Sequence, residues 1–166
     1  YRGKNVVISG GGDSALDWAI FLADGVAEKV TLIHRSQSFR AHPDSVQKAM
    51  DMADSGKINM LMDAEVKSIG GNGKLSDIHV KTKADGHITL NADSWLPLFG
   101  LTPRLGPIAN WGLNIDKKTI EVDTEKFETN QKGIYAVGDI CNYPGKLKLI
   151  LSGFHEGALA ARACFK

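Results

Sequence analysis

Asn5-Val-Val-Ile-Ser-Gly-Gly-Gly-Asp-Ser-Ala15 is the stretch that decides the fold of this 166-residue chain. Residues 5–9 form a short, β-branched apolar run, which is typical of a buried parallel strand. Three glycines then end the strand. Residues 13–24 follow with apolar side chains at helical spacing, with Asp13 or Ser14 as the expected cap and Gly25 where a helix would end. The stretch therefore predicts a strand, a glycine turn and a helix.

The glycine turn fits the dinucleotide pattern G-x-G-x-x-A, and its place between a strand and a helix is the one that this pattern requires. Gly10 would permit the tight turn, Gly12 would let a pyrophosphate approach the backbone, and Ala15 would let the helix pack on the strand. Unpaired amide hydrogens near Asp13 and Ser14 would face the phosphates. The alternative is a turn that only joins strand to helix, but the context favours a nucleotide site.

The second strand, predicted at residues 29–33, indicates which nucleotide binds. An NAD site usually has Asp or Glu at the end of this strand, and neither occurs between Thr31 and Ala41. Arg35 and Arg40 stand there instead, and guanidinium groups suit a phosphate on the adenosine ribose. His34 alone is weak support, because a histidine at a strand end is usually a surface residue, and the alternative for the whole segment is a solvated loop. Together with the glycines, the pattern favours NADP.

The rest of the first half completes a Rossmann-like α/β domain. A helix at 44–55, with Val46, Ala49, Met50 and Ala53 on one face, precedes an apolar strand at 58–62. Short alternating runs separated by glycine-rich turns predict an antiparallel β-meander, at residues 65–69, 77–83 and 87–90. Residues 95–99 form another strand, in which Pro97 is confined to an edge or a bulge.

We place the domain boundary near Pro97, giving domains 1–97 and 98–166. The second part is loop-rich, with a short strand at 134–137 and a final helix at 147–165 that is interrupted or preceded by Ser152-Gly153. Gly138-Asp139 follows the short strand and is by itself ordinary turn chemistry. Solvent exposure is the simplest interpretation of His155-Glu156 on the final helix, and a contact with the flavin edge or with a partner is the alternative.

Composition excludes several functions. The net charge of +1 argues against nucleic-acid or membrane-surface binding. No apolar run approaches the ~20 residues of a membrane span. Two cysteines suit a reducing compartment, so we expect a cytoplasmic protein, and the histidines lack metal-ligand spacing. Because the chain begins with Tyr1, we expect it to be a piece of a longer polypeptide.

Several stretches together resemble the thioredoxin-reductase-like ferredoxin–NADP reductases. They are Gly10 to Trp18, His34-Arg35 through Phe39-Arg40-Ala41-His42, Leu105 to Leu113, and Gly138-Asp139-Ile140-Cys141 through Lys146. The resemblance implies that residues 1–97 are an NADPH domain and that residues 98–166 are the C-terminal segment of an FAD domain, whose N-terminal segment is absent. It also implies that Gly138 and Asp139 contact the flavin ribityl chain and that Leu149 and Ile150 lie near the flavin ring.

The implied reaction is hydride transfer from NADPH to FAD, then electron delivery to ferredoxin or flavodoxin, in a homodimeric parent enzyme. No catalytic side chain is named, because the cofactors carry the chemistry. The isolated chain is expected to bind NADP only and to be inactive. Two residues depart from the family pattern: Ser36 replaces a frequent second arginine, and Pro97 interrupts a strand. The alternatives are thioredoxin reductase, with its C-x-x-C upstream of Tyr1, and a non-catalytic NADP-binding module.

Overall fold

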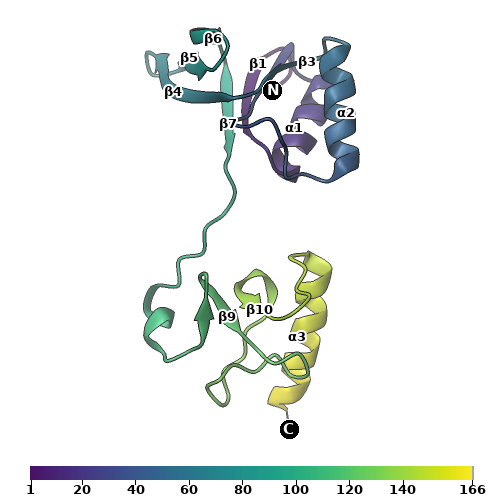
Figure 1. The fold of residues 1–166 in the computed structure, drawn as a ribbon, viewed down its shortest axis with the longest axis vertical. Helices are drawn as coiled ribbons and strands as arrows, with labels where there is room; N and C mark the ends of the chain where they lie inside the picture. Colours follow the sequence, from purple (N-terminus) through teal and green to yellow (C-terminus); the bar gives the residue numbers. More distant parts are fainter. Residues whose placement is uncertain (166) are drawn as a thin grey trace. The chain divides into compact units, whose positions relative to one another are not determined.

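The computed structural model describes residues 1–165, which divide into two compact units after Gly100 (Figure 1). Buried apolar side chains form separate clusters within each unit, so each unit is described by itself. Across residues 1–165, every helix is too short or too polar to span a lipid bilayer.

The first unit is built on a four-stranded parallel sheet. Its strands lie in the order β3-β2-β1-β7, with β1 at Asn5–Gly10, β2 at Lys29–Ile33, β3 at Ile58–Leu61 and β7 at Ser94–Leu98. The chain adds β2 and β3 on one side of β1 and β7 on the other, so the winding direction reverses at β1. In open α/β sheets, ligands bind at such a switch point, beyond the carboxyl ends of the strands. Pro97 lies in edge strand β7, which confirms the prediction made for this residue.

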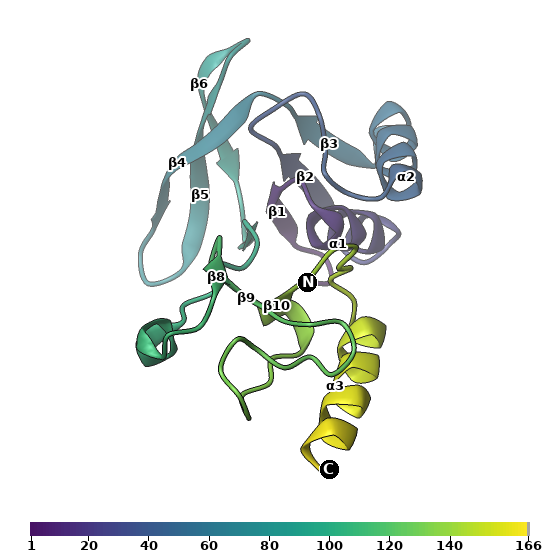
Figure 2. The ribbon, with the colours of Figure 1, turned by 60° about the horizontal axis from the view of Figure 1, so that its bottom comes forward.

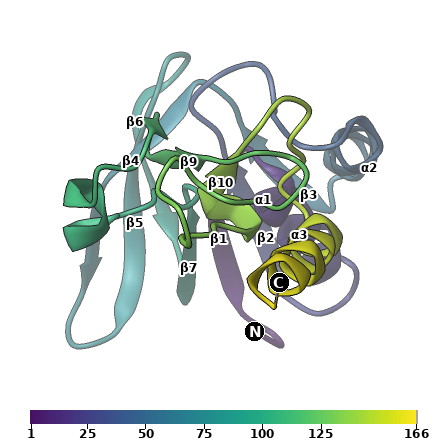
Figure 3. The same ribbon diagram turned by 90° about the horizontal axis from the view of Figure 1, so that it is seen from below.

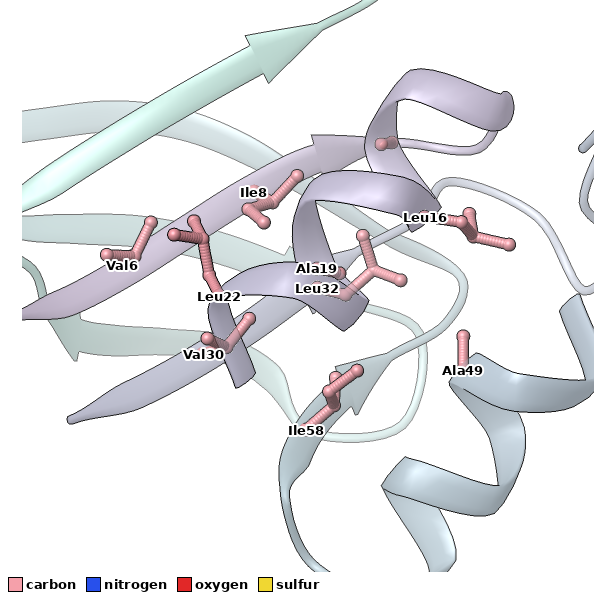
Figure 4. Close-up of a cluster of buried hydrophobic side chains, with 10 residues drawn as sticks. Val6, Ile8, Leu16, Ala19, Leu22, Val30, Leu32, Ala49 and Ile58 are labelled. Atoms are coloured by element: carbon pink, nitrogen blue, oxygen red, sulfur yellow. The ribbon is translucent and has the colours of Figure 1, made fainter. Parts of the chain in front are cut away.

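Both faces of this sheet are covered, which explains why its strands are apolar throughout. Val6 and Ile8 of β1 pack with helices α1, Asp13–Ala23, and α2, Pro43–Asp54, in the cluster drawn in Figure 4. Val7, whose side chain points to the opposite face, packs with residues of the second sheet of this unit.

The second sheet is an antiparallel meander in the order β4-β5-β6, with strands Ala64–Gly71, Leu75–Thr82 and Gly86–Asn91. Ile78 and Val80 of β5 are fully buried against the parallel sheet. The predicted Rossmann-like α/β unit, with a parallel sheet and an antiparallel meander, is therefore confirmed.

Two details of the predicted helices are wrong. Neither Asp13 nor Ser14 caps α1, whose N-cap is Gly12 without a side-chain hydrogen bond. Met50 does not belong to the inner face of α2: its side chain is 41% exposed, and Met52 packs on the core instead. The buried face is centred on Ala49, so the residue three positions later lies closer to it than its immediate neighbour does.

The second unit holds a small three-stranded sheet in the order β10-β9-β8 and one long helix, α3, at Ile150–Cys164. The strands are short: β8 is Ile115–Asp116, β9 is Thr119–Glu121 and β10 is Cys141–Asn142. Two 3₁₀ turns complete it, η1 at Gly106–Asn110 and η2 at Gly138–Ile140. Figures 2 and 3 both show α3 running past β10.

Two predictions for this unit are wrong. Residues 134–137 form no strand, only an isolated bridge between Tyr135 and Glu128, because a single short segment faces them. The final helix begins at Ile150, not at residue 147, and Ser152-Gly153 lies inside it without interrupting it. The N–H of Gly153 bonds to Leu149 O (3.1 Å), so the first turn is regular despite the glycine.

Candidate functional site

A cavity of about 350 Å³ opens in the first unit beyond the carboxyl ends of β1, β2 and β7. This is the switch point of the parallel sheet, and the predicted site residues Gly10, His34, Arg35 and Arg40 line it. Trp95 also lines it. The structure therefore brings the glycine turn and the arginine segment together.

The glycine turn connects β1 directly to α1. Gly10 has to be glycine, because a Cβ there would lie 2.6 Å from Leu98 O and 2.8 Å from Ala15 Cβ. Gly12, by contrast, faces open space, with no atom within 4 Å of a Cβ built there. That opening is what close approach of a pyrophosphate to the backbone needs.

The first turn of α1 retains free donors. No side chain caps this helix, so the N–H groups of Asp13 and Ser14 have no partner within the helix. The Asp13 carboxylate accepts a hydrogen bond from His42 N (2.7 Å), which ties it to the start of α2. The helix terminus can therefore bind an anion through its backbone.

His34 is not the surface residue that its strand-end position suggested. Its exposed fraction is 8%, and its imidazole lies against Gly11, where any Cβ would overlap the ring. The ring stacks on Phe39, with centroids 4.7 Å apart, and its Nε2 lies 2.9 Å from Ser38 O and 3.0 Å from Ser36 Oγ. His34 thus anchors the segment that carries the arginines.

The arginine segment is fastened to the glycine turn at a second point. Arg40 N donates a hydrogen bond to Gly11 O (2.7 Å), and Gln37 Nε2 donates one to Asp63 Oδ2 (2.6 Å). Both Arg35 and Arg40 are exposed, and within residues 1–165 neither guanidinium forms an ion pair. Two unpaired cations on an anchored segment form a suitable site for a phosphate.

Trp95 contributes an aromatic wall. Its indole Nε1 donates a hydrogen bond to Ser9 Oγ (2.9 Å), and its ring meets Phe99 edge-on at 6.4 Å. No sequence pattern assigned this tryptophan to the site. Its role depends on β7 pairing with β1, which brings residues 86 positions apart into contact.

The remaining predicted site residues lie in the second unit. Gly138 begins η2 with φ +78°, and Asp139 follows it with an exposed side chain. Leu149 and Ile150 start α3 and are also exposed. The structure brings η2 against α3: a Cβ built at Gly153 would lie 3.4 Å from Gly138 Cα.

Glu156 is fully buried, so the prediction that its side chain is exposed is wrong. Its Oε2 accepts hydrogen bonds from Gly138 N (2.7 Å) and Cys141 Sγ (3.3 Å). Its Oε1 accepts one from the Tyr143 hydroxyl (2.7 Å) and pairs with Lys146 Nζ. Its partners come from the loop before α3, so a helical pattern alone gives no sign of them.

This network keeps Glu156 ionised. Burial acts to raise the pKa of Glu156, but the hydrogen bonds from Lys146, Tyr143 and Gly138 outweigh burial and lower the pKa to about 2. Burial raises the pKa of the Cys141 thiol, and Glu156 raises it further, so the thiol stays protonated and donates. Within residues 1–165, no three His, Cys, Asp or Glu side chains gather in a way that could hold a metal ion.

Comparison with known proteins agrees with this architecture. The family model described as pyridine nucleotide-disulphide oxidoreductase matches residues 2–157. A curated relative from Christiangramia forsetii, "Ferredoxin--NADP reductase 1", is 51% identical over 100% of this chain and 48% of its own length. A "Ferredoxin--NADP reductase" from Parvibaculum lavamentivorans is also 51% identical, with the same coverage.

Solved structures of thioredoxin reductases share the fold of this chain. A thioredoxin reductase from Lactococcus lactis matches 99% of this chain and 53% of its own, with a TM-score of 0.81 and 26% identity. A thioredoxin reductase from T. acidophilum matches with the same TM-score and 27% identity.

The chain belongs to the pyridine nucleotide-disulphide oxidoreductase family, and the resemblance inferred from its motifs is confirmed. It spans about half the length of the curated relatives it matches.

Proposed function

We propose that the chain is the NADPH-binding domain (1–97) and the C-terminal segment of the FAD-binding domain (98–166) of a ferredoxin–NADP reductase. The observation that carries the proposal is the cavity at the switch point, which is lined both by Gly10 and Gly11 of the glycine turn and by the two arginines, Arg35 and Arg40. The 51% identical relatives that bear this name support it.

Residues that line the cavity and residues of the adjoining start of α1 would bind different parts of NADPH. The pyrophosphate would lie at Gly10, Gly12 and the first N–H groups of α1, while Arg35 and Arg40 would hold the phosphate on the ribose. Each charge-assisted hydrogen bond contributes roughly 1.5–3 kcal/mol, so the pair would favour NADPH over NADH by about a hundredfold or more. His34 would act by holding the arginine segment against Gly11, since Ser36 and Ser38 already occupy its Nε2.

The second unit supplies residues suited to one side of an FAD site. The exposed carboxylate of Asp139 can accept hydrogen bonds from a polyol. No atom lies within 4 Å of a Cβ built at Gly138, so a ligand can approach the backbone there. Leu149 and Ile150 offer an exposed apolar surface at the uncapped start of α3. Bound FAD would supply the chemistry, accepting a hydride from NADPH and releasing single electrons.

The electron acceptor in this proposal is ferredoxin or flavodoxin, and the parent enzyme is a homodimer. The relatives' names support ferredoxin over the thioredoxin of the more distant structural neighbours. Both cysteines are free thiols, which supports a reducing compartment such as the cytoplasm.

The test is an assay of the longer protein, reconstituted with FAD and supplied with NADPH, against ferredoxin and thioredoxin in parallel. We expect rapid reduction of ferredoxin and none of thioredoxin. Thioredoxin reduction would support the alternative enzyme, and absence of flavin absorbance would support a non-catalytic NADP-binding module.

A separate test uses the 166-residue chain alone. We expect it to bind NADP in a titration but to purify without FAD and to lack diaphorase activity, because half of the flavin site is missing. Stoichiometric FAD in the purified chain would contradict this expectation.

A further inference from the structure

The buried carboxylate of Glu156 connects α3 to the loop before it. All four of its partners lie between residues 138 and 146, and three of them, Cys141, Tyr143 and Lys146, hold the carboxylate within that loop. The bond from Gly138 N reaches the turn η2 directly, and Cys141, the C-cap of η2, supports the same turn because its Sγ also lies 3.2 Å from Gly138 O. The carboxylate of Glu156 therefore helps to fix where η2 lies on the helix.

A buried ion pair is an unusual way to hold a turn. Lys146 has a side chain 5% exposed, and its ammonium lies 5.4 Å from the centre of the Tyr143 ring. Burying both charges costs free energy. Replacing a buried ion pair with apolar residues of similar volume often leaves a protein equally stable or more stable. A buried carboxylate that accepts a hydrogen bond from one backbone N–H of a turn restricts the position of that turn.

The turn η2 exposes the side chain of Asp139 to solvent. The hydrogen bond of Gly138 points into the protein, toward Glu156, while the next side chain, that of Asp139, is exposed. The left-handed conformation of Gly138, φ +78°, allows this change of direction within one residue. Gly153 of α3 packs against the same glycine, so the turn is held at two points.

We infer that Glu156 is a positioning residue for the flavin: its carboxylate, held by Lys146 and Tyr143, accepts the hydrogen bond of Gly138 and so fixes Asp139 for contact with FAD. The inference rests on the proposed function, which places Asp139 at the FAD site. FAD binding then depends on the acceptor that faces Gly138 and not on the charge of the ion pair.

Two double variants of the longer protein distinguish the effect of losing the hydrogen-bond acceptor of Gly138 from the effect of losing the charges of the ion pair. Lys146→Met with Glu156→Gln removes both charges but keeps an amide oxygen that can accept from Gly138. Lys146→Met with Glu156→Leu removes both charges and the acceptor. The dissociation constant of FAD is measured for each apoprotein by flavin fluorescence, and the melting temperature is measured alongside.

We expect the Gln variant to bind FAD within about twofold of the wild type. We expect the Leu variant to bind about tenfold more weakly, because Gly138 N loses its acceptor, and to melt at a lower temperature than the Gln variant, because the Cys141 thiol and the Tyr143 hydroxyl lose theirs as well. Equal FAD affinity in the two double variants would overturn the inference. A wild-type protein that binds no FAD would instead overturn the proposed function.

Hydrogen exchange gives a test that does not depend on either variant folding. In the FAD-free wild-type protein, the Gly138 amide should exchange at least tenfold more slowly than the Asp139 amide, because the first is bonded to a buried carboxylate. Exchange of the Gly138 amide at the rate of an unprotected residue would mean that Glu156 does not hold the turn, and would also overturn the inference.

Discussion

The imidazole of His34 lies directly against the backbone of Gly11, filling the space where a side chain at that glycine would be. This contact joins the two parts of the candidate site, because Gly11 belongs to the glycine turn and His34 begins the segment that carries Arg35 and Arg40. The ring of Phe39 stacks on the imidazole of His34. The packing of His34 therefore fixes the position of the arginine segment relative to the glycine turn.

This contact predicts that Gly11→Ala is harmful while Gly12→Ala is tolerated. The methyl group added by Gly11→Ala would displace the buried ring of His34, and overpacking of this kind costs about 1–3 kcal/mol. Gly12 faces open space, so alanine there should cost no more than about 1 kcal/mol, the cost of placing a poorer N-cap residue at the start of α1. Urea unfolding of both variants measures the difference, and equal stability would show that His34 does not pack as described.

The position of Trp95 predicts an optical signal for coenzyme binding. Because its ring lines the cavity, NADPH should quench its fluorescence on binding. Trp95→Phe should remove most of this quenching, whereas Trp18→Phe, on the outer side of α1 and 44% exposed, should leave it unchanged. Quenching that survives in Trp95→Phe would place the nicotinamide coenzyme elsewhere.

The network around Glu156 predicts how the second unit responds to acid. The pKa of Glu156 in the folded chain, about 2, is below the ordinary value of 4.5 for a glutamate. Its ionised form therefore stabilises the fold fully above about pH 4.5, and this contribution is lost as the pH falls toward 2. The backbone N–H of Gly138 bonds to this carboxylate, so its NMR shift should titrate near pH 2. A midpoint near pH 4.5 would contradict the buried network.

Much of the first unit could be predicted from short stretches of sequence. The apolar runs at residues 5–9 and 29–33, the glycine turn and the alternating runs of the meander each determine their own local structure. The cavity also follows from them, because the glycine turn and the arginine segment both follow strands whose carboxyl ends meet at one edge.

What could not be predicted depends on contacts between distant segments. The burial of His34 requires a glycine in the turn after the neighbouring strand β1, and the burial of Glu156 requires four donors from residues 138–146. Trp95 enters the site only because β7 returns to pair with β1. Residues 134–137 failed as a strand for the same reason: an apolar run forms a strand only where a partner of sufficient length lies beside it.

Selection of the phosphorylated coenzyme by Arg35 and Arg40 can be measured by isothermal calorimetry of this chain with NADPH and with NADH. We predict that the wild-type chain binds NADPH about a hundredfold more tightly than NADH. The double variant Arg35→Gln/Arg40→Gln should lose this preference, and Arg2→Gln, an exposed arginine outside the cavity, should keep it. Equal affinity of the wild-type chain for the two coenzymes would contradict the account.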